Sequence, residues 1–284
     1  MAKSLGNKLI WLGPAVGLLA ILSFYPLIFS VKVSLTGARG AFTLAHYARL
    51  LTDQLFHAAV IQTGLYAAVS LIAETILGLA LALLIDSLHR GRAFFRAGLL
   101  APLLLPPVVC AVVWRLIFNP QFGVLNGTLR SWGIDTSNLT WTNGSNTALL
   151  SVAAVDIWQW TPFMFLLLSA GLQAVPRDPI EAAKIDGASP WRVFVDIVFP
   201  LLKPTLLLAV ILRAMDLIRI FDQIWILTQG GPGSATETVS LYIYKTAFRF
   251  FNFGYAAAMS FLGLLLTTIF ARNLIKLAAV RGRA

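Results

Sequence analysis

Long apolar runs, separated by short polar segments, dominate the chain. Each run is long enough for a helix that crosses the hydrocarbon core of a membrane, which takes about 20 residues. Strands of a transmembrane barrel would instead alternate polar and apolar positions over about 10 residues, and these runs do not. The pattern predicts an all-α polytopic membrane protein with six transmembrane helices, at residues 9–31, 58–85, 97–118, 148–175, 205–227 and 250–271.

Composition supports a lipid environment for most of the chain. Hydrophobic residues make up 58% and charged residues 12% of its 284 residues, whereas about a quarter of a soluble protein is charged. No loop has the length or composition of a separate soluble domain, so we expect one membrane domain over residues 1–284. The first run follows two lysines as a signal peptide would, but its length and the five later runs favour a retained helix. Cys110 is the single cysteine, which excludes a disulfide within the chain.

The net charge of +10 raises the question of a nucleic-acid partner. If the N-terminus is cytoplasmic, thirteen basic residues fall on that side and six on the other, as the positive-inside rule predicts. The cytoplasmic set is Lys3, Lys8, Arg90, Arg92, Arg96, Arg177, Lys184, Arg192, Lys203, Arg272, Lys276, Arg281 and Arg283, and the external set is Lys32, Arg39, Arg49, Arg130, Lys245 and Arg249. The charge therefore indicates orientation, with both termini cytoplasmic, and no nucleic-acid partner.

The sequence contains no recognisable motif for catalysis or for nucleotide binding. A Gly-Gly-Pro-Gly run at residues 230–233 lacks the Gly-Lys-Ser/Thr that a phosphate-binding loop requires. Nucleophile–base and metal-ligand spacings are also missing, so we predict no catalytic residue, metal or cofactor in this chain. If ATP is used, another polypeptide binds it.

The polar segment between the fourth and fifth runs contains clear helix start and stop signals. Asp178 is predicted to cap a helix with proline at its first position and Glu181 at its third. Gly187 is the expected end of that helix, since glycine adopts the left-handed conformation of a C-terminal cap. Ser189 and the proline after it begin a second helix, which Pro200 is predicted to close.

Two interpretations of this helical pair are open. Alanines surround the joint at Gly187, so another protein can approach its backbone closely, and Trp191 and Phe194 supply apolar area for docking. Alternatively, the pair is an interfacial amphipathic hairpin that lies on lipid headgroups.

The same segment resembles the cytoplasmic signature of permeases of ATP-binding cassette importers. That signature is Glu-Ala-Ala, three residues, Gly, nine residues and Ile-x-Leu-Pro. Here Glu181, Gly187, Ile197 and Pro200 fall at the matching positions, and Phe199 replaces the usual Leu. The resemblance implies that residues 177–200 form a coupling segment that seats in a cleft of an ATPase subunit. Its expected contact residues are Glu181, Ala182, Ala183, Asp186, Gly187, Ala188, Trp191 and Arg192.

The resemblance extends to residues 172–176 and 227–244, which are similar to the carbohydrate-uptake branch and its maltose- or glycerol-phosphate-type first permease. It implies a fold like that of type I importers and a place in a bacterial or archaeal inner membrane. The partners it implies are a second, related permease in a heterodimer, two ATPase subunits that bind ATP and Mg, and an extracytoplasmic solute-binding protein.

Polar residues within the fourth run suggest a path for the substrate. Asp156, Gln159, Trp160 and Phe163 share one helical face, because they are spaced at i, i+3, i+4 and i+7. Acid and amide groups bond sugar hydroxyls, and aromatic rings stack on apolar sugar faces. By resemblance, the matching face in the maltose-type permease lines the substrate site. The alternative is a helix-packing face with one paired acid.

Charged residues three positions apart mark the fifth run. Arg213, Asp216, Leu217 and Ile220 form one predicted substrate face, and Arg219 and Asp222 are expected to meet the partner subunit or an outer gate. Alternatively, all these charges form ion pairs that fix helix packing. Arg213 would also suit an anionic solute such as glycerol phosphate.

Two other function classes remain open. One is a secondary transporter driven by protons through Glu74, Asp156, Asp216 and Asp222, although we favour pairing of Glu74 with a neighbouring helix. The other is a membrane scaffold that transports nothing.

Overall fold

The computed structural model describes residues 2–37, 40–88 and 90–281. Arg39 and Arg283, which entered the charge count above, lie outside the described residues. Contacts divide the chain into two compact units. Unit 1 comprises residues 1–54 and 242–266, and unit 2 comprises residues 55–241 and 267–284. The expectation of one membrane domain stays a prediction.

Unit 1 joins the N-terminal helices to a later part of the chain. Its elements are α1 (Ala2–Ser34), α2 (Ala45–Leu50), the end of α12 (Val239–Tyr244), a π-helical turn (Lys245–Arg249) and the first half of α13 (Phe253–Arg281). The Asp53 carboxylate accepts hydrogen bonds from the hydroxyls of Tyr242, at 2.7 Å, and Tyr255, at 2.6 Å. The guanidinium of Arg49 lies 4.3 Å from the centre of the Tyr255 ring. These polar contacts tie the segment after α2 to α12 and α13.

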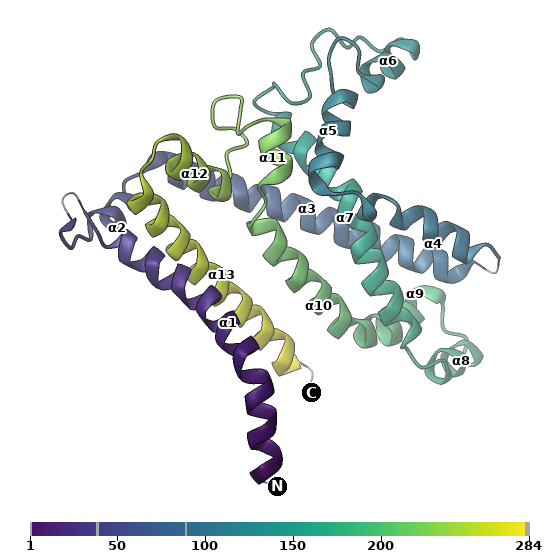
Figure 1. Cartoon of the computed structure of the whole chain (residues 1–284). Helices are drawn as coiled ribbons and strands as arrows, with labels where there is room; N and C mark the ends of the chain where they lie inside the picture. Colours follow the sequence, from purple (N-terminus) through teal and green to yellow (C-terminus); the bar gives the residue numbers. More distant parts are fainter. Residues whose placement is uncertain (1, 38–39, 89, 282–284) are drawn as a thin grey trace. The chain divides into compact units, whose positions relative to one another are not determined.

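Unit 2 contains the helices from α3 to α11, which are labelled in Figure 1. In chain order they are α3 (Gln54–Ser87), α4 (Arg92–Leu100), a 3-10 turn (Pro102–Leu104), α5 (Pro107–Ile117), α6 (Val124–Ser131), α7 (Ala148–Gln173), α8 (Asp178–Ile185), α9 (Pro190–Val193), a π-helical turn (Phe194–Val198), α10 (Phe199–Ile218) and α11 (Asp222–Leu227). Helices suit these apolar runs because every backbone donor and acceptor is satisfied within the segment, as lipid requires.

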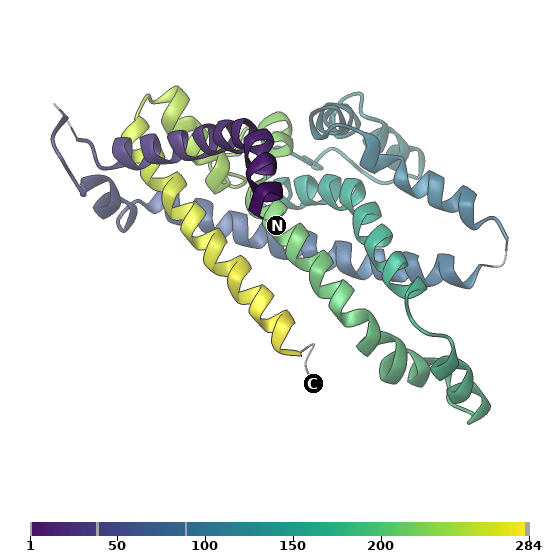
Figure 2. The same ribbon diagram turned by 60° about the horizontal axis from the view of Figure 1, so that its bottom comes forward.

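Small residues let the long helices of unit 2 pack closely. A Cβ added to Gly78 of α3 would lie 2.6 Å from Cβ of Met164 in α7. One added to Gly171 of α7 would lie 2.7 Å from Leu202 in α10. Helices α7 and α10 lie side by side in both views (Figure 1, Figure 2). Glycine at such contacts allows the close backbone approach on which helix packing in membranes depends.

The contact at Gly171 gives a first prediction. Replacing Gly171 with valine is expected to destabilise the protein by about 1–3 kcal/mol, since overpacking a close contact forces side chains or backbone to shift. The measurement is the Tm of the purified transporter in detergent. Gly64→Val in α3 is the matched control, because a Cβ there meets nothing within 4 Å. An equal Tm for both variants would contradict close packing at Gly171.

The described residues contain five helices that are long and apolar enough to cross a membrane, or six if one bent pair counts as a single span. The predicted third span is that pair, and its two halves meet at 94°. The span predicted at residues 97–118 is therefore formed by two helices that meet at a bend and not by one continuous helix. The physical reason is the Pro106–Pro107 pair, because proline cannot donate a helical hydrogen bond and pushes the residue before it into an extended conformation. Leu105 has a ψ of 131°.

The predicted fifth span is also broken. Helix α10 ends at Ile218, and α11 begins at Asp222 after a short irregular stretch. The expectation of one helix to residue 227 is therefore wrong. The hydroxyl of Thr238 donates to the carbonyl of Ile220 at 3.3 Å, so a distant residue satisfies a backbone group that the break sets free.

Candidate functional site

The polar segment between α7 and α10 folds into the predicted pair of short helices. Helix α8 ends in a Schellman motif: the N–H of Ala188 donates to the carbonyl of Ala183 at 2.9 Å, and that of Gly187 to Lys184 at 3.1 Å. Gly187 has a φ of +76°, a conformation that glycine adopts without steric cost. The prediction that Gly187 ends the first helix is confirmed.

The helix starts were predicted with mixed success. Ser189 precedes α9, and its hydroxyl accepts a hydrogen bond from the backbone N–H of Arg192 at 3.4 Å, so that cap is confirmed. The predicted cap at Asp178 is wrong, because α8 begins at Asp178 itself and the capping position is Arg177, which makes no side-chain capping bond.

The prediction that Pro200 closes the second helix is wrong. Helix α9 passes through the π-helical turn directly into α10, and Pro200 lies in the first turn of α10. Proline suits this place because its missing N–H is one that a helix start leaves without an intrahelical partner. The coupling segment is therefore continuous with α10.

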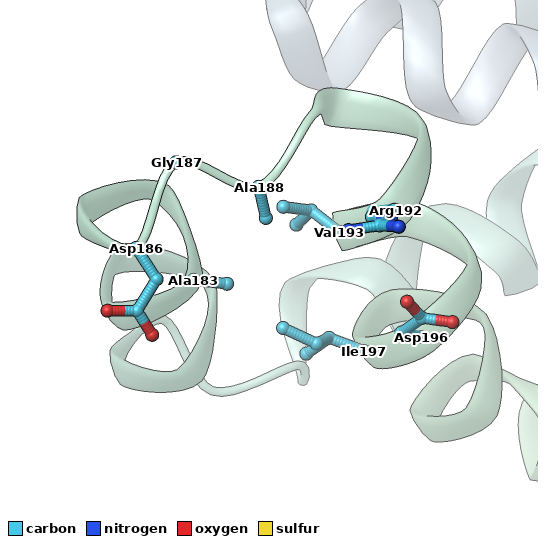
Figure 3. Close-up of a pocket in the computed structure, with 8 residues that line it drawn as sticks. All are labelled: Ala183, Asp186, Gly187, Ala188, Arg192, Val193, Asp196 and Ile197. Carbon is cyan, nitrogen blue, oxygen red and sulfur yellow. The ribbon is translucent and has the colours of Figure 1, made fainter.

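A concave pocket of about 320 Å³ lies between α8 and the segment formed by α9 and the π-helical turn (Figure 3). Five residues predicted for ATPase contact line it, and Val193, Asp196 and Ile197 complete it; the five are Ala183, Asp186, Gly187, Ala188 and Arg192. The methyl groups of Ala183 and Ala188 point into the space, with Val193 and Ile197 facing them.

The other predicted contact residues lie outside this pocket on exposed surface. They are Glu181, Ala182 and Trp191. Trp191 is 71% exposed, and Ile185, which sequence reasoning missed, is 86% exposed. Its place directly before Asp186 and Gly187, two of the predicted contact residues, was the signal for it. Together they place apolar area beside the pocket.

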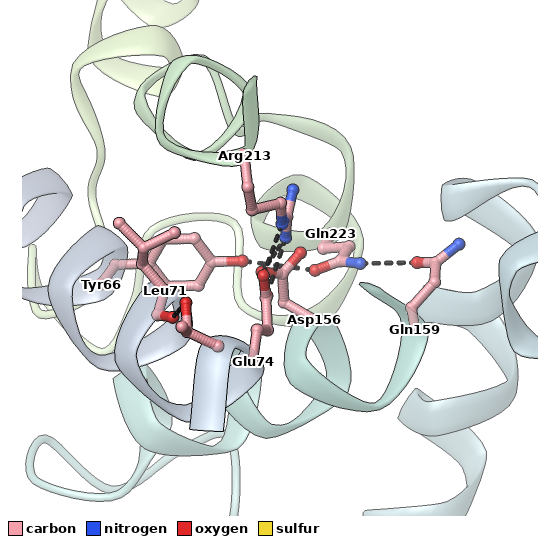
Figure 4. A network of polar contacts seen from close by, with 8 residues as sticks. Tyr66, Leu71, Glu74, Asp156, Gln159, Arg213 and Gln223 are labelled. Atoms are coloured by element: carbon pink, nitrogen blue, oxygen red, sulfur yellow. Dashed lines mark hydrogen bonds and ion pairs between the residues drawn. The ribbon is translucent and has the colours of Figure 1, made fainter. Parts of the chain in front are cut away.

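A buried charge cluster joins three long helices (Figure 4). Arg213 of α10 donates to both carboxylate oxygens of Glu74 in α3, at 2.7 and 3.0 Å. Its guanidinium also pairs with Asp156 of α7. All three side chains are buried, and breaking such a cluster by removing one partner is costly. The expected pairing of Glu74 with a neighbouring helix is confirmed.

A chain of amide groups continues from the cluster toward the bend after α4. Tyr66 donates to the side-chain carbonyl of Gln223 at 3.4 Å, and Gln223 donates to Gln159 at 2.7 Å. Gln159 in turn donates to the backbone carbonyl of Leu105 at 2.8 Å. That carbonyl belongs to the extended residue before Pro106, so the glutamine satisfies a group that the bend sets free.

The aromatic residues predicted for the substrate path lie beside this cluster. Trp160 presents its ring to Arg213, with the guanidinium carbon 4.7 Å from the ring centre. Phe163 meets Trp160 edge to face, with ring centres 6.1 Å apart. Both rings remain partly exposed, whereas Asp156 and Gln159 are buried. The four residues therefore divide into a buried polar pair and a partly exposed aromatic pair.

The structure does not place the charged residues of the predicted fifth span on the two faces expected from an unbroken helix. Arg213 and Leu217 are buried, but Asp216 is exposed and pairs with Arg219 at 3.5 Å. Ile220 and Asp222 lie beyond the end of α10, so the helical spacing no longer governs where they point. The charges split instead into a buried cluster at Arg213 and an exposed pair at Asp216.

In the part of the chain that the structure describes, no group of three or more His, Cys, Asp or Glu side chains is arranged to hold a metal ion. Helices long and apolar enough to cross a membrane, with a glycine-jointed pair of short helices between α7 and α10, are features expected of a transport permease. This class is tested directly by similarity to known proteins.

The family of binding-protein-dependent transport system inner membrane components matches residues 74–277. The trehalose/maltose transport system permease protein MalF of Thermococcus litoralis is 40% identical over 241 residues, which cover 84% of this chain and 80% of that protein. The trehalose transport system permease protein SugA of Mycobacterium tuberculosis is 36% identical over 256 residues, 88% of this chain and 81% of that protein.

The fold is also that of a solved transporter. A chain in the crystal structure of a bacterial alginate ABC transporter, in complex with an alginate pentasaccharide-bound periplasmic protein, superposes with a TM-score of 0.86. It is 19% identical, and the match covers 96% of this chain and 93% of that one.

The chain therefore belongs to the family of binding-protein-dependent transport system inner membrane components. It is a multi-pass permease subunit of an ATP-binding cassette importer in the inner membrane, with the type I fold. It is a transport subunit and not an enzyme.

Proposed function

We propose that this chain forms half of the translocation pathway for a sugar and couples it to a separate ATPase through residues 177–200. The relatives named for trehalose and maltose transport support a sugar as the solute. The observation that carries the coupling role is the joint at Gly187, where an added Cβ would meet no atom of this chain within 4 Å. That open space leaves room for a partner's surface.

The chemistry of the coupling segment suits a protein cleft. Ile185 and Trp191 offer exposed apolar area, and Asp186 and Arg192 form part of a charged rim around small alanines. Interfaces combine an apolar centre with a polar rim in this way. Because α9 continues into α10, a displacement of the segment would carry α10 and the Arg213 cluster with it, which supports alternating access by rigid-body motion.

The orientation of the chain is part of the proposal. Arg92, after α3, and Arg177, before α8, line one shared pocket. Both residues were assigned to the cytoplasmic side from charge alone, so their proximity supports that assignment and, with it, cytoplasmic termini.

The substrate surface is proposed to be aromatic. Trp160 and Phe163 keep part of their rings exposed, and a ring face packs well on the apolar C–H face of a sugar. Gln159 and Arg213 donate to protein groups, and Asp156 pairs with Arg213 through one carboxylate oxygen, so we assign these three residues to positioning those rings and the three helices. Movement of α10 would be needed to bring three other predicted residues to the substrate pathway: Asp216, Leu217 and Ile220.

Arg213 no longer favours an anionic solute. Its charge is balanced by Glu74 and Asp156 in the buried cluster, so the argument for glycerol phosphate loses its basis. The same contacts weaken the proton-driven alternative, because two of its four acids are held by a guanidinium.

The exposed charges near the end of α10 support a second permease as partner. Asp216, Arg219 and Asp222 are exposed at a helix break within the membrane domain. Charged groups this close to the end of a candidate membrane span face water or another subunit, because lipid does not solvate them. We propose a heterodimer with a related permease, bound to two ATPase subunits that carry ATP and Mg and served by an external solute-binding protein.

The aromatic surface gives a second prediction. Trp160→Ala is expected to reduce uptake of trehalose or maltose at low concentration about fivefold, since stacking on an aromatic ring is worth about 1 kcal/mol. The measurement is uptake of the labelled sugars into proteoliposomes that hold the complete transporter. Trp158→Ala is the matched control: Trp158 is on the same helix but meets Trp114 edge to face, with ring centres 5.6 Å apart. Equal uptake by the two variants would refute the aromatic surface.

A further inference from the structure

A second pocket, of about 290 Å³, lies where α3 ends, α4 begins and α7 meets α8. Its volume is near the lower end of pockets that hold small molecules. Three arginines line it together with one acid, one amide and three apolar residues: Arg92, Arg96 and Arg177, Asp86, Gln173, and Leu172, Val175 and Ile180. The lining therefore carries a net charge of about +2 at neutral pH.

The arginines are not neutralised within the chain. In the part of the chain that the structure describes, no ion pair joins any of the three to a carboxylate, including Asp86. Arg92 donates to the backbone carbonyls of Asp86 and Leu88, which carry no net charge. The pocket is therefore cationic and suited to bind an anion.

Arg96 is held in place for such a contact. Its Nη2 donates to the hydroxyl of Ser169 in α7 at 3.5 Å, and the same hydroxyl accepts from Gln173 at 3.3 Å. Its Nε is buried and has no hydrogen-bond partner among the described residues. A buried donor without a partner costs free energy, so an acceptor oxygen bound there would be favoured.

The surroundings of the pocket are those of a membrane surface. Helix α4 begins at Arg92 and exposes two aromatic residues in its first turn, Phe94 at 79% and Phe95 at 52%. Exposed aromatic rings beside arginines are typical of segments at the level of lipid headgroups. Leu172, Val175 and Ile180 add an apolar wall, which a free inorganic ion does not need.

We infer that this pocket binds the phosphate group of an anionic phospholipid, with Arg92, Arg96 and Arg177 as its cationic partners. Basic pockets between membrane helices hold phosphate headgroups by the same chemistry. Because Arg177 immediately precedes α8, the bound lipid lies against the start of the coupling segment.

Titration of phospholipids onto the delipidated, purified complete transporter, followed by native mass spectrometry, tests this site. The probes are dioleoyl phosphatidylglycerol and, as the neutral comparison, dioleoyl phosphatidylcholine. The double variant Arg92→Gln/Arg96→Gln is expected to bind phosphatidylglycerol about 30-fold more weakly, since each arginine near a membrane surface contributes a factor of about five. Arg90→Gln/Lys203→Gln removes two charges predicted for the same side but outside the pocket, and is expected to bind it like the unchanged protein.

Several outcomes would overturn the inference. Equal affinities of the two double variants, or of the two lipids for the unchanged protein, would do so. Displacement of phosphatidylglycerol by excess inorganic phosphate would make the pocket a site for the free anion and overturn the lipid assignment. If loss of the Arg96–Ser169 contact prevents assembly, the single variant Arg92→Gln replaces the double variant. Its affinity for phosphatidylglycerol is expected to be about fivefold lower than that of Arg90→Gln.

Discussion

Replacing Gly187 with leucine is expected to abolish uptake, to background level, while the protein stays in the membrane. Leucine would fill the open space at the joint between α8 and α9, where a Cβ meets nothing within this chain, and so would obstruct the partner ATPase. Leucine also disfavours the left-handed conformation that φ = +76° requires, by about 1–2 kcal/mol. The measurement is sugar uptake and ATP hydrolysis by the reconstituted transporter, with hydrolysis expected to lose its response to loaded binding protein.

Gly133→Leu is the matched control for this experiment. Gly133 has a φ of +80° and equally open surroundings, but it follows α6, far along the chain from the coupling segment. Both variants bear the same backbone strain, so a difference between them reports the coupling surface. Undiminished uptake in Gly187→Leu, or an equal loss in Gly133→Leu, would contradict the coupling role.

Arg213→Met is expected to destabilise the protein by about 3–5 kcal/mol, because it leaves Glu74 and Asp156 buried without a counter-charge. The measurement is the Tm of the purified transporter, along with its amount in the membrane. A fall of several degrees or loss of the assembled complex is the expected result.

The triple variant Glu74→Gln/Asp156→Asn/Arg213→Met separates charge from shape. It removes all three charges at nearly constant volume, and a buried amide without its partner costs less free energy than a buried charge without its counter-charge. Its Tm is therefore expected to exceed that of Arg213→Met alone. A triple variant no more stable than the single one would show that the packing of Arg213, and not the charge balance, holds the three helices.

Features with local signals were predictable from the sequence. Gly187 and Ser189 act through their own backbone and side-chain preferences, so the joint between the two short helices was predicted at the right residues. Apolar runs likewise predicted the spans, because lipid forces each into a helix. The predicted capping residue, Asp178, is one position after the observed one, Arg177, and helix ends are usually uncertain by one or two residues.

Features that depend on tertiary contacts were not predictable. Helix α10 ends at Ile218 without a proline or glycine, and Thr238, far along the chain, satisfies the freed carbonyl of Ile220. The fifth-span charges were assigned to faces on the assumption of an unbroken helix, so Asp216 was grouped with Arg213 although it pairs with Arg219. The bend was predictable from Pro106 and Pro107, but the span was predicted from hydropathy alone, which does not register a bend.

Photo-crosslinking from Ile185 tests the central claim, that the segment after α7 docks on a separate ATPase. Ile185 is 86% exposed at the end of α8, and a photoreactive benzoylphenylalanine there should not disturb the packing of this chain. The account predicts an adduct between this permease and the ATPase subunit in native membranes. Benzoylphenylalanine in place of the exposed Phe122, before α6, should give no ATPase adduct. An ATPase adduct from position 122, or none from position 185 in an assembled transporter, would contradict the account.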